Sequence, residues 1–184
     1  MALLNRRDAT VVPGAFNALA AKMVADEGFE AVYVSGAGVT NAYLGVPDLG
    51  LISLNELADN VAAMRDVVDI PIVSDADTGF GNAVNVTRTV RVLERAGANG
   101  IQLEDQVFPK KCGHFSGKAV IPADEAIQKI RAAVDARKDG DFVIVARTDA
   151  RSVLGFEAAL ERAHSFIEAG ADVTFVEAPE SIEE

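Results

Sequence analysis

Short apolar runs alternate with helix-like stretches along this chain, and that alternation restricts the folds it can adopt. Six apolar runs are typical of β-strands, and each of the first five precedes a stretch with helical periodicity. The predicted strands cover residues 10–12, 31–34, 70–73, 100–103, 141–146 and 172–176. Strands that are apolar nearly throughout indicate a sheet buried on both faces, so we expect parallel strands with helices outside.

End signals delimit the predicted helices. Ser53 followed by Glu56 is a capping box, and Gly28, Gly97 and Gly170 stand where helices should stop. The predicted helices cover residues 17–27, 54–67, 85–96, 122–137 and 156–169. A long connection, roughly residues 106–121, separates the fourth strand from its helix.

Two architectures suit this order, a doubly wound open sheet and a (β/α)8 TIM barrel. Polar side chains follow five successive strands, and a barrel gathers all such strand ends into one ring where catalytic groups lie. An open sheet would spread them along a line and use mainly its switch point. These polar residues are Ser35, Asp75, Asp77, Glu104, Arg147 and Glu177. We therefore predict an α/β fold of the barrel type.

The chain has 184 residues, whereas a full barrel typically needs about 250. We expect residues 1–184 to form a single, incomplete TIM-barrel catalytic domain that covers about the first six β/α units. The end of the chain, residues 181–184, reads as the start of a further helix. The chain is accordingly expected to be part of a longer protein.

The formal net charge of −11 argues against a nucleic-acid partner, because such proteins carry a basic surface. An acidic protein that binds an anionic substrate must gather positive charge locally, from Arg, Lys or a metal ion. A single cysteine excludes an internal disulfide and favours a reducing compartment. No apolar run approaches a membrane span or a signal peptide, so we expect no membrane partner and a cytoplasmic protein.

Carboxylates at two neighbouring strand ends suggest a metal site. Asp75 and Asp77 follow the third predicted strand and Glu104 follows the fourth. Like charges held together repel unless a cation lies among them, and hard oxygen donors suit Mg²⁺ or Mn²⁺. The alternative is that these are ordinary loop acids, with Asp77 capping the next helix.

Cys112 lies in a polar, glycine-containing loop beside Lys110, Lys111 and His114. Nearby cations favour a thiolate, whereas a lone cysteine is more often buried and inert. A zinc site is not expected, because the chain has no second cysteine and only two histidines. A cysteine–histidine nucleophile pair stays open, although a two-residue spacing defines no geometry.

Ser35-Gly36-Ala37-Gly38 could cradle a carboxylate or phosphate with backbone N–H groups, or could simply be a tight turn. It is not a dinucleotide fingerprint, because Asn41 stands where the third glycine belongs. Arg147 is a natural bidentate partner for a substrate carboxylate, or else forms a salt bridge with a neighbouring acid. His164, in the middle of a predicted helix, is interpreted as structural or exposed.

Taken together, these motifs resemble those of the isocitrate lyase and phosphoenolpyruvate mutase superfamily. The pentapeptide Lys110-Lys111-Cys112-Gly113-His114 is similar to the lyase signature, and the resemblance runs from about residue 8 to the end. It is strongest to the short members, the methylisocitrate lyases and 2,3-dimethylmalate lyases. Supporting segments are residues 35–38, 45–48, 75–81, 102–106 and 146–150.

The resemblance implies a role for each matching position. Asp75, Asp77 and Glu104 would bind Mg²⁺, with Asp75 nearest and the others acting through water. Cys112 would be the catalytic acid on a mobile loop. The substrate would contact Ser35, Gly36, Ala37, Asp48, Cys112, Gly113, His114, Arg147 and Glu177, of which His114, Arg147 and Glu177 would also act in catalysis. Ala37 departs from the glycine that is frequent in the family. Members form homotetramers that exchange their last helix.

The implied reaction is a Mg²⁺-dependent cleavage of the carbon–carbon bond of a small 2-hydroxy di- or tricarboxylic acid. It yields a keto acid, pyruvate or glyoxylate, and a second carboxylic acid that Cys112 protonates. The residues do not indicate the deprotonating base or the site of the substrate's second carboxylate. An oxaloacetate hydrolase or a phosphonopyruvate-type enzyme of the same superfamily is the alternative. A non-catalytic protein of the same fold is disfavoured by the set of retained polar residues.

Overall fold

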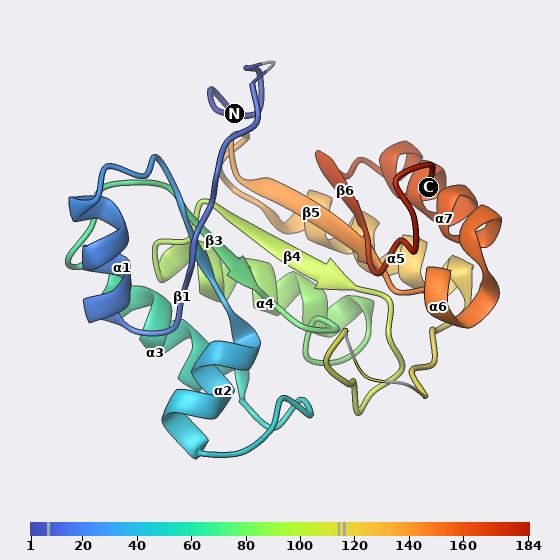
Figure 1. The fold of residues 1–184 in the computed structure, drawn as a ribbon, viewed down its shortest axis with the longest axis horizontal. Coiled ribbons are helices and arrows are strands. Elements are labelled where there is room, and N and C mark those ends of the chain that lie inside the picture. Colours follow the sequence, from blue (N-terminus) through green and yellow to red (C-terminus); the bar gives the residue numbers. More distant parts are fainter. Residues whose placement is uncertain (7, 114, 116) are drawn as a thin grey trace.

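The computed structural model describes residues 1–6, 8–113, 115 and 117–184. Its strands are β1 (Gly14–Ala15), β2 (Val32–Val34), β3 (Ile72–Asp75), β4 (Gly100–Glu104), β5 (Val143–Thr148) and β6 (Val173–Val176). They form one sheet in the order β1-β2-β3-β4-β5-β6, and every pairing is parallel (Figure 1). A doubly wound sheet would reverse its order at a switch point. The unreversed order is that of a barrel wall, as predicted.

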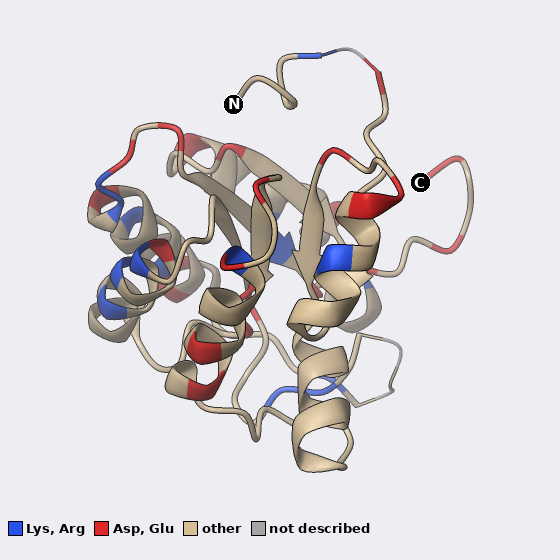
Figure 2. Cartoon of the chain, turned by 90° about the vertical axis from the view of Figure 1, so that its left-hand side faces the viewer, with Lys and Arg blue, Asp and Glu red and all other residues tan. Residues whose placement is uncertain are grey.

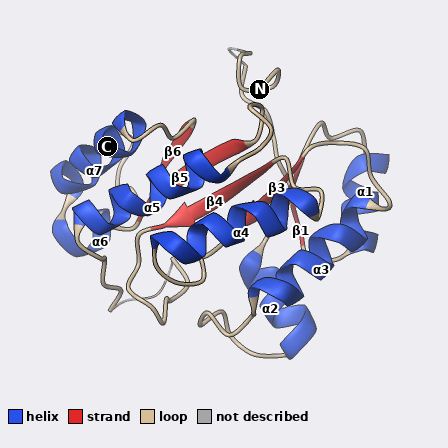
Figure 3. Ribbon diagram, turned by 180° about the vertical axis from the view of Figure 1, so that it is seen from behind, coloured by secondary structure: helices blue, strands red, loops and turns tan. Residues whose placement is uncertain are grey.

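The helices connect successive strands. They are α1 (Ala18–Asp26), α2 (Gly36–Leu44), α3 (Leu54–Arg65), α4 (Ala83–Arg95), α5 (Ala123–Ala136), α6 (Arg151–Leu154) and α7 (Phe156–Glu168). Helices α4 and α5 cover one face of the sheet, behind the strands in Figure 1 and in front of them in Figure 3. The described residues therefore form six consecutive β/α units, the last of which has its strand but no helix.

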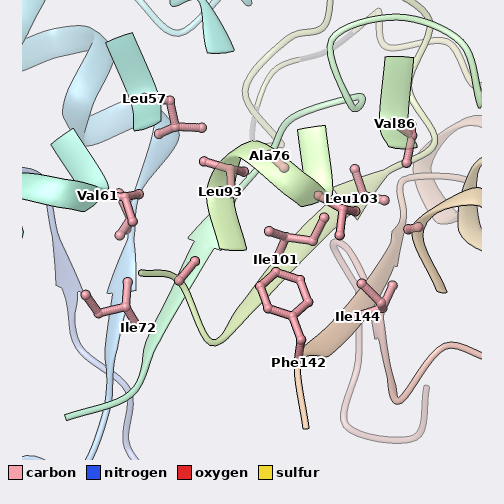
Figure 4. Packing of buried hydrophobic residues seen from close by; sticks show 14 of the residues in the cluster. Leu57, Val61, Ile72, Ala76, Val86, Leu93, Ile101, Leu103, Phe142 and Ile144 are labelled. Carbon is pink, nitrogen blue, oxygen red and sulfur yellow. The ribbon is translucent and has the colours of Figure 1, made fainter. Parts of the chain in front are cut away.

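A single apolar core lies between the sheet and the helices (Figure 4). Leu57 and Val61 of α3 and Leu93 of α4 meet Ile72 and Ile101 of the strands, and all five are almost completely buried. Burial of side chains of this size stabilises the fold by roughly 1.5–3 kcal/mol each. The core thus ties the helical layer to one face of the strands and leaves the other face for different side chains.

The helices that the sequence predicts are all present, and their caps explain where they begin. Ser53 and Glu56 make the expected capping box of α3, and Asn82 with Asn85 makes one at the start of α4. Asp77 does not cap α4, which removes the alternative explanation for that carboxylate. Within the described part of the chain, none of the helices is long and apolar enough to cross a bilayer.

Two local predictions are wrong. The first strand was expected at residues 10–12, but β1 begins at Gly14, because pairing with β2 starts where Tyr33 N donates to Pro13 O. Residues 181–184 were expected to begin a helix. They are irregular, and Glu184 is instead held by the guanidinium of Arg151.

Two helices were not foreseen. Helix α2 occupies the stretch after Ser35 that reads as a turn, since Gly36 and Gly38 have low helix propensity. The short helix α6 precedes α7. Tertiary packing and the Ser35 cap outweigh propensity in α2.

Candidate active site

The predicted polar residues of the strands lie on the face of the sheet that points away from the helices. Successive side chains of a strand alternate between faces. In β5, Ile144 and Ala146 belong to the core, so Arg147 points to the opposite face. Asp75 and Glu104 follow the same alternation in β3 and β4, and Glu104 is the register partner of Arg147. This inward face corresponds to the interior of a barrel.

Tyr33 is a member of this inward face that the sequence did not single out. Val32 and Val34 on either side of it are core residues, so its phenol points inward, level with Val73 of β3. Burial, together with the charges of Asp75 and Glu104, raises the pKa of Tyr33 well above its usual value. The phenol therefore keeps its proton and is a hydrogen-bond donor. Strand alternation was the signal that could have identified it.

The three predicted metal ligands, Asp75, Asp77 and Glu104, lie close together, and all three have raised pKa values. Burial, reinforced by the charge of Asp75, raises the pKa of Asp77 to about 7. Burial and the same neighbour raise the pKa of Glu104 well above its usual value. The pKa of Asp75 is also raised, chiefly by burial. A cluster of acids with raised pKa values needs a compensating cation to be fully ionised.

Lys110 supplies part of the positive charge that these carboxylates need. It lies on the connection between β4 and α5, roughly residues 106–121, which contains Cys112 and is called the cysteine loop below. Its Nζ lies 2.6 Å from Oδ2 of Asp48 and 2.7 Å from Oδ1 of Asp77, and all three side chains are buried. Burial opposes the charged amine, but Asp77, Asp75 and Glu104 outweigh it and raise the pKa of Lys110. Lys110 thus links Asp48, a predicted substrate contact, to Asp77 through an ion pair that local sequence did not indicate.

The backbone of Asp77 is itself unusual, since this non-glycine residue has a φ of 46°. Its N–H donates to Oδ1 of Asp75 at 3.1 Å, which holds the two carboxylates in a compact turn. The turn is supported from outside by Lys129, whose Nζ donates to Thr78 O at 3.1 Å. A non-glycine residue in this left-handed backbone conformation destabilises the fold by on the order of 1–3 kcal/mol, and such residues cluster at functional sites.

Arg147 lies in the middle of a ring of carboxylates. Its Nε and Nη2 donate to the two oxygens of Asp149 at 2.9 and 3.0 Å. Glu177 approaches at 3.4 Å and Glu104 at 3.7 Å, and the guanidinium carbon lies 5.9 Å from the Phe175 ring centre. These acids raise the pKa of Arg147 although burial opposes it. The salt bridge to a neighbouring acid that the sequence left open for Arg147 is therefore present.

The cysteine loop packs against Arg147 and Glu177. A Cβ built on Gly113 would lie 2.5 Å from Nη2 of Arg147 and 2.6 Å from Oε1 of Glu177, so any larger residue would have to displace these two side chains. Cys112, a free and partly buried cysteine, directly precedes it. Lys111 points elsewhere, with its Nζ donating to Gly117 O at 2.8 Å. His114 lies outside the described residues. His164 is exposed on α7, as expected.

Ser35, Gly36 and Ala37 begin α2 next to the acids. The hydroxyl of Ser35 accepts from Gly38 N at 3.1 Å, which makes Ser35 the helix cap. A Cβ on Gly36 would lie 2.8 Å from Oδ2 of Asp75. The expected backbone cradle is thus the first turn of a helix, whose free N–H groups suit an anion.

The donor set fits a hard divalent cation that keeps part of its coordination shell. Among the described residues, Oε1 of buried Glu104 accepts no hydrogen bond, and Asp75 is close by. No group of three or more His, Cys, Asp or Glu side chains in this part of the chain is placed to hold a metal ion by itself. Mg²⁺ typically binds through one or two carboxylates and retains several waters, which agrees with both observations. The three predicted metal ligands stay a prediction.

Positive charge is concentrated in the loop between β4 and α5. Figure 2 shows acidic residues spread over helices and loops, in contrast to this basic loop. The described basic residues of that loop are Lys110, Lys111 and Lys118. In a chain with a net charge of −11, this loop brings positive charge to the ends of the strands.

Comparison with known proteins agrees with this geometry. A family model described as phosphoenolpyruvate phosphomutase matches residues 1–184. The chain is 56% identical over 182 residues to a 2-methylisocitrate lyase of Aeropyrum pernix, covering 99% of this chain and 58% of the relative. It is 50% identical over 182 residues to a 2,3-dimethylmalate lyase of Eubacterium barkeri, covering 99% and 63%. The chain thus spans about three fifths of the length of these relatives.

Solved structures of three activities are similar to the chain. A 2,3-dimethylmalate lyase, described as a PEP mutase/isocitrate lyase superfamily member, gives a TM-score of 0.94 at 37% identity, covering 99% of this chain and 62% of that one. Oxaloacetate acetylhydrolase with 3,3-difluorooxalacetate gives 0.93 at 40% identity, covering 97% and 62%. Phosphonopyruvate hydrolase with oxalate and Mg²⁺ gives 0.85 at 36% identity, covering 95% and 60%.

These likenesses extend over nearly the whole chain, and the unreversed parallel sheet is the first six β/α units of a (β/α)8 barrel. Asp75, Glu104 and Arg147 lie at the ends of β3, β4 and β5, and Asp48, Cys112 and Gly113 lie on the connections that follow β2 and β4. This chain therefore belongs to the phosphoenolpyruvate mutase and isocitrate lyase superfamily, in which its relatives include named lyases.

Proposed function

We propose that the protein is a Mg²⁺-dependent carbon–carbon lyase that cleaves a small 2-hydroxy di- or tricarboxylic acid of the 2-methylisocitrate or 2,3-dimethylmalate class. One observation carries the proposal. The loop with Cys112 packs on Arg147 and Glu177, next to the carboxylates of Asp75, Asp77 and Glu104. A proton donor, a cationic group and candidate metal ligands then lie next to one another at the same end of the sheet. The high identity to named lyases supports the same assignment.

In the proposed reaction, the substrate hydroxyl loses its proton and the adjacent carbon–carbon bond breaks. The former hydroxyl carbon becomes the carbonyl of a keto acid, and the electron pair of the broken bond remains on the second fragment as an enolate of its carboxylate. Arg147 and the N–H groups at the start of α2 would hold substrate carboxylate oxygens. Tyr33, which keeps its proton, would donate a hydrogen bond to a substrate oxygen.

The enolate-like fragment must receive a proton on carbon before release. Cys112 would donate its S–H proton as general acid and be reprotonated before the next turnover. Asp48, Gly113 and Glu177 would line the pocket around it, as would His114. The basic loop residues would offset the substrate's negative charge, and a closed loop would exclude water.

Asp75, Asp77 and Glu104 would hold the metal ion, Asp75 most directly. When bound, Mg²⁺ or Mn²⁺ would stabilise negative charge that develops on the keto-acid oxygens. The structural relative with oxalate and Mg²⁺ supports this cofactor. Oε1 of Glu104, which is buried and accepts no hydrogen bond from the described residues, supports a bound cation independently.

Oxaloacetate hydrolysis is the second candidate. The TM-score of 0.93 to oxaloacetate acetylhydrolase favours it, since the same wall of the barrel serves another reaction there. A phosphonopyruvate-type reaction is disfavoured by the cysteine pentapeptide at residues 110–114. We further propose a cytoplasmic homotetramer with exchanged C-terminal helices, consistent with the single cysteine.

The test is an assay of the full-length protein with Mg²⁺ against 2-methylisocitrate, 2,3-dimethylmalate, malate derivatives and oxaloacetate. Formation of pyruvate or glyoxylate from a hydroxy acid is expected. Oxalate from oxaloacetate, with no hydroxy-acid cleavage, would establish the hydrolase instead. Cys112→Ser should reduce turnover by about 10²- to 10⁴-fold, and full turnover in that variant would exclude the acid role.

A further inference from the structure

Lys118 leaves the cysteine loop and turns back beneath it. Its Nζ donates to Gly113 O at 2.7 Å and to Oδ1 of Asp149 at 2.7 Å. The Lys118 side chain is 2% exposed and that of Asp149 is 0% exposed. An ammonium group withdrawn from water in this way is held by its acceptors and not by solvent. One of those acceptors is the carbonyl of Gly113, the residue that follows Cys112.

Asp149 is a rigid anchor for that ammonium. Its two oxygens accept from Arg147, and its N–H donates to Oδ1 of Asp105 at 2.8 Å. Asp105 is fixed in turn by the hydroxyl of Thr148 at 2.6 Å and by Arg162 at 3.1 Å. The anchor is therefore part of the barrel wall, joined to β4, β5 and α7.

The same carboxylate thus binds both sides of the site. Through Arg147 it orients the predicted substrate-binding cation, and through Lys118 it holds the carbonyl of Gly113. Gly113, which Lys118 contacts, also lies close to Arg147, so the two groups that Asp149 binds meet at Gly113. Moving the loop away would break the Lys118 contact to Gly113, to Asp149 or to both.

We propose that Lys118 is a positioning residue that latches the Cys112 loop onto the Asp149 carboxylate and so holds the thiol at the pocket. The catalytic part of this role rests on the proposed lyase function. The latch itself does not, because it is a property of the substrate-free protein. A hydrogen bond between charged, buried partners shifts such an equilibrium by about tenfold or more.

A simpler role for Lys118 would be neutralisation of Asp149. Arg147 already meets that need, since its hydrogen bond and charge, ahead of those of Lys118, lower the pKa of Asp149 although burial opposes this. Neutralisation also does not require a bond to Gly113 O. The two roles predict different behaviour of Cys112, which makes them separable.

The first experiment measures alkylation of Cys112 by iodoacetamide in the substrate-free, full-length protein, with the Cys112 peptide followed by mass spectrometry. Lys118→Met should accelerate alkylation about tenfold. Lys138→Met removes an equal charge from an exposed lysine between α5 and β5, and should leave the rate unchanged. An unchanged rate in a folded Lys118→Met protein would overturn the latch.

The double variant Lys118→Met with Asp149→Asn separates latching from neutralisation. If Lys118 is a latch, thermal stability recovers relative to Lys118→Met while alkylation stays fast. If it only neutralises Asp149, both stability and the slow alkylation rate recover, and the proposal fails. If Lys118→Met does not fold, the alkylation rate of the folded double variant is compared with that of the native protein. A faster rate in the double variant supports the latch, and an equal rate overturns it.

Steady-state kinetics test the positioning role. Lys118→Met should lower kcat by about tenfold or more with a smaller change in KM, because proton delivery suffers more than binding. Lys118→Arg retains a cation that can reach both acceptors and should recover part of the kcat. A rise in KM with an unchanged kcat would contradict the role. If no variant or native protein shows lyase activity, the proposed function fails while the alkylation result still decides the latch.

Discussion

The ammonium of Lys110 lies 2.6 Å from Oδ2 of Asp48, and both side chains are buried although 62 positions separate them in the chain. The same ammonium lies 2.7 Å from Asp77. The pair closes the cysteine loop over the segment that follows α2. It also brings a tethered cation to the carboxylates that we propose as metal ligands.

Breaking this pair should be costly in metal-free protein. Lys110→Met leaves Asp48 and Asp77 buried without their cation, and we expect a loss of about 3–5 kcal/mol in the free energy of unfolding. Adding Asp48→Asn removes one stranded charge, so the double variant should lose less than the sum of the single losses. Urea denaturation with a chelator present measures all three, and strict additivity would argue against the pair.

The pKa of about 7 for Asp77 predicts an unusual pH dependence. An unfolded aspartate titrates near 3.9, so between about pH 4 and pH 7 the folded state binds more protons than the unfolded state. The contribution of Asp77 to stability is complete below about pH 4 and is lost as pH rises through 7. Denaturant titrations of metal-free protein should show this decline, and Asp77→Asn should flatten it.

Magnesium binding should respond in the opposite direction, because the metal competes with protons for the same carboxylates. We expect Mg²⁺ affinity to increase between pH 6 and pH 8, with protons released on binding. Calorimetric titrations in buffers of different ionisation heat would count those protons. Affinity that is equal at both pH values would count against Asp77 as a ligand.

Gly36 should be intolerant of even a methyl group. Gly36→Ala would put a Cβ 2.8 Å from Oδ2 of Asp75, whereas a Cβ on Gly140 meets nothing within 4 Å. Displacing the carboxylate should weaken Mg²⁺ binding by about 10- to 100-fold, by analogy with disturbed outer-shell contacts. Gly140→Ala is the matched control and should bind Mg²⁺ normally. Equal affinities would show that Asp75 can move freely or does not hold the metal.

Arg162 should be a main contributor to stability at the back of the site. It donates to Asp105 at 3.1 Å and to Ile121 O at 2.8 Å. Arg162→Met leaves the buried Asp105 with an uncompensated charge, for an expected loss of about 3–5 kcal/mol. Arg131→Met, at an exposed position of α5, should change stability by no more than about 0.5 kcal/mol. Chemical denaturation of the two variants compares them directly.

Local sequence was sufficient for the alternation of strands and helices, apart from α2 and α6, and for the polar residues at the strand ends. Apolar runs and helix caps are read from neighbouring residues, so the β/α alternation and the capping box at Ser53 follow from the chain itself. Asp75, Glu104 and Arg147 were identifiable because each directly ends an apolar run. The barrel interpretation followed from the rule that parallel strand ends meet.

Contacts between distant segments were decided only by the tertiary structure. Strand alternation separates Tyr33 from Val32 and Val34, but only the burial of those two valines against the helices shows that the face of Tyr33 is the inward one. The partners of Lys110 and Lys118 lie 62 and 31 positions away, beyond the reach of any local pattern. The sequence by itself indicated the polar residues at the carboxyl ends of β3, β4 and β5. The folded chain decided which of them touch, because burial and electrostatic pairing act through space and not along the backbone.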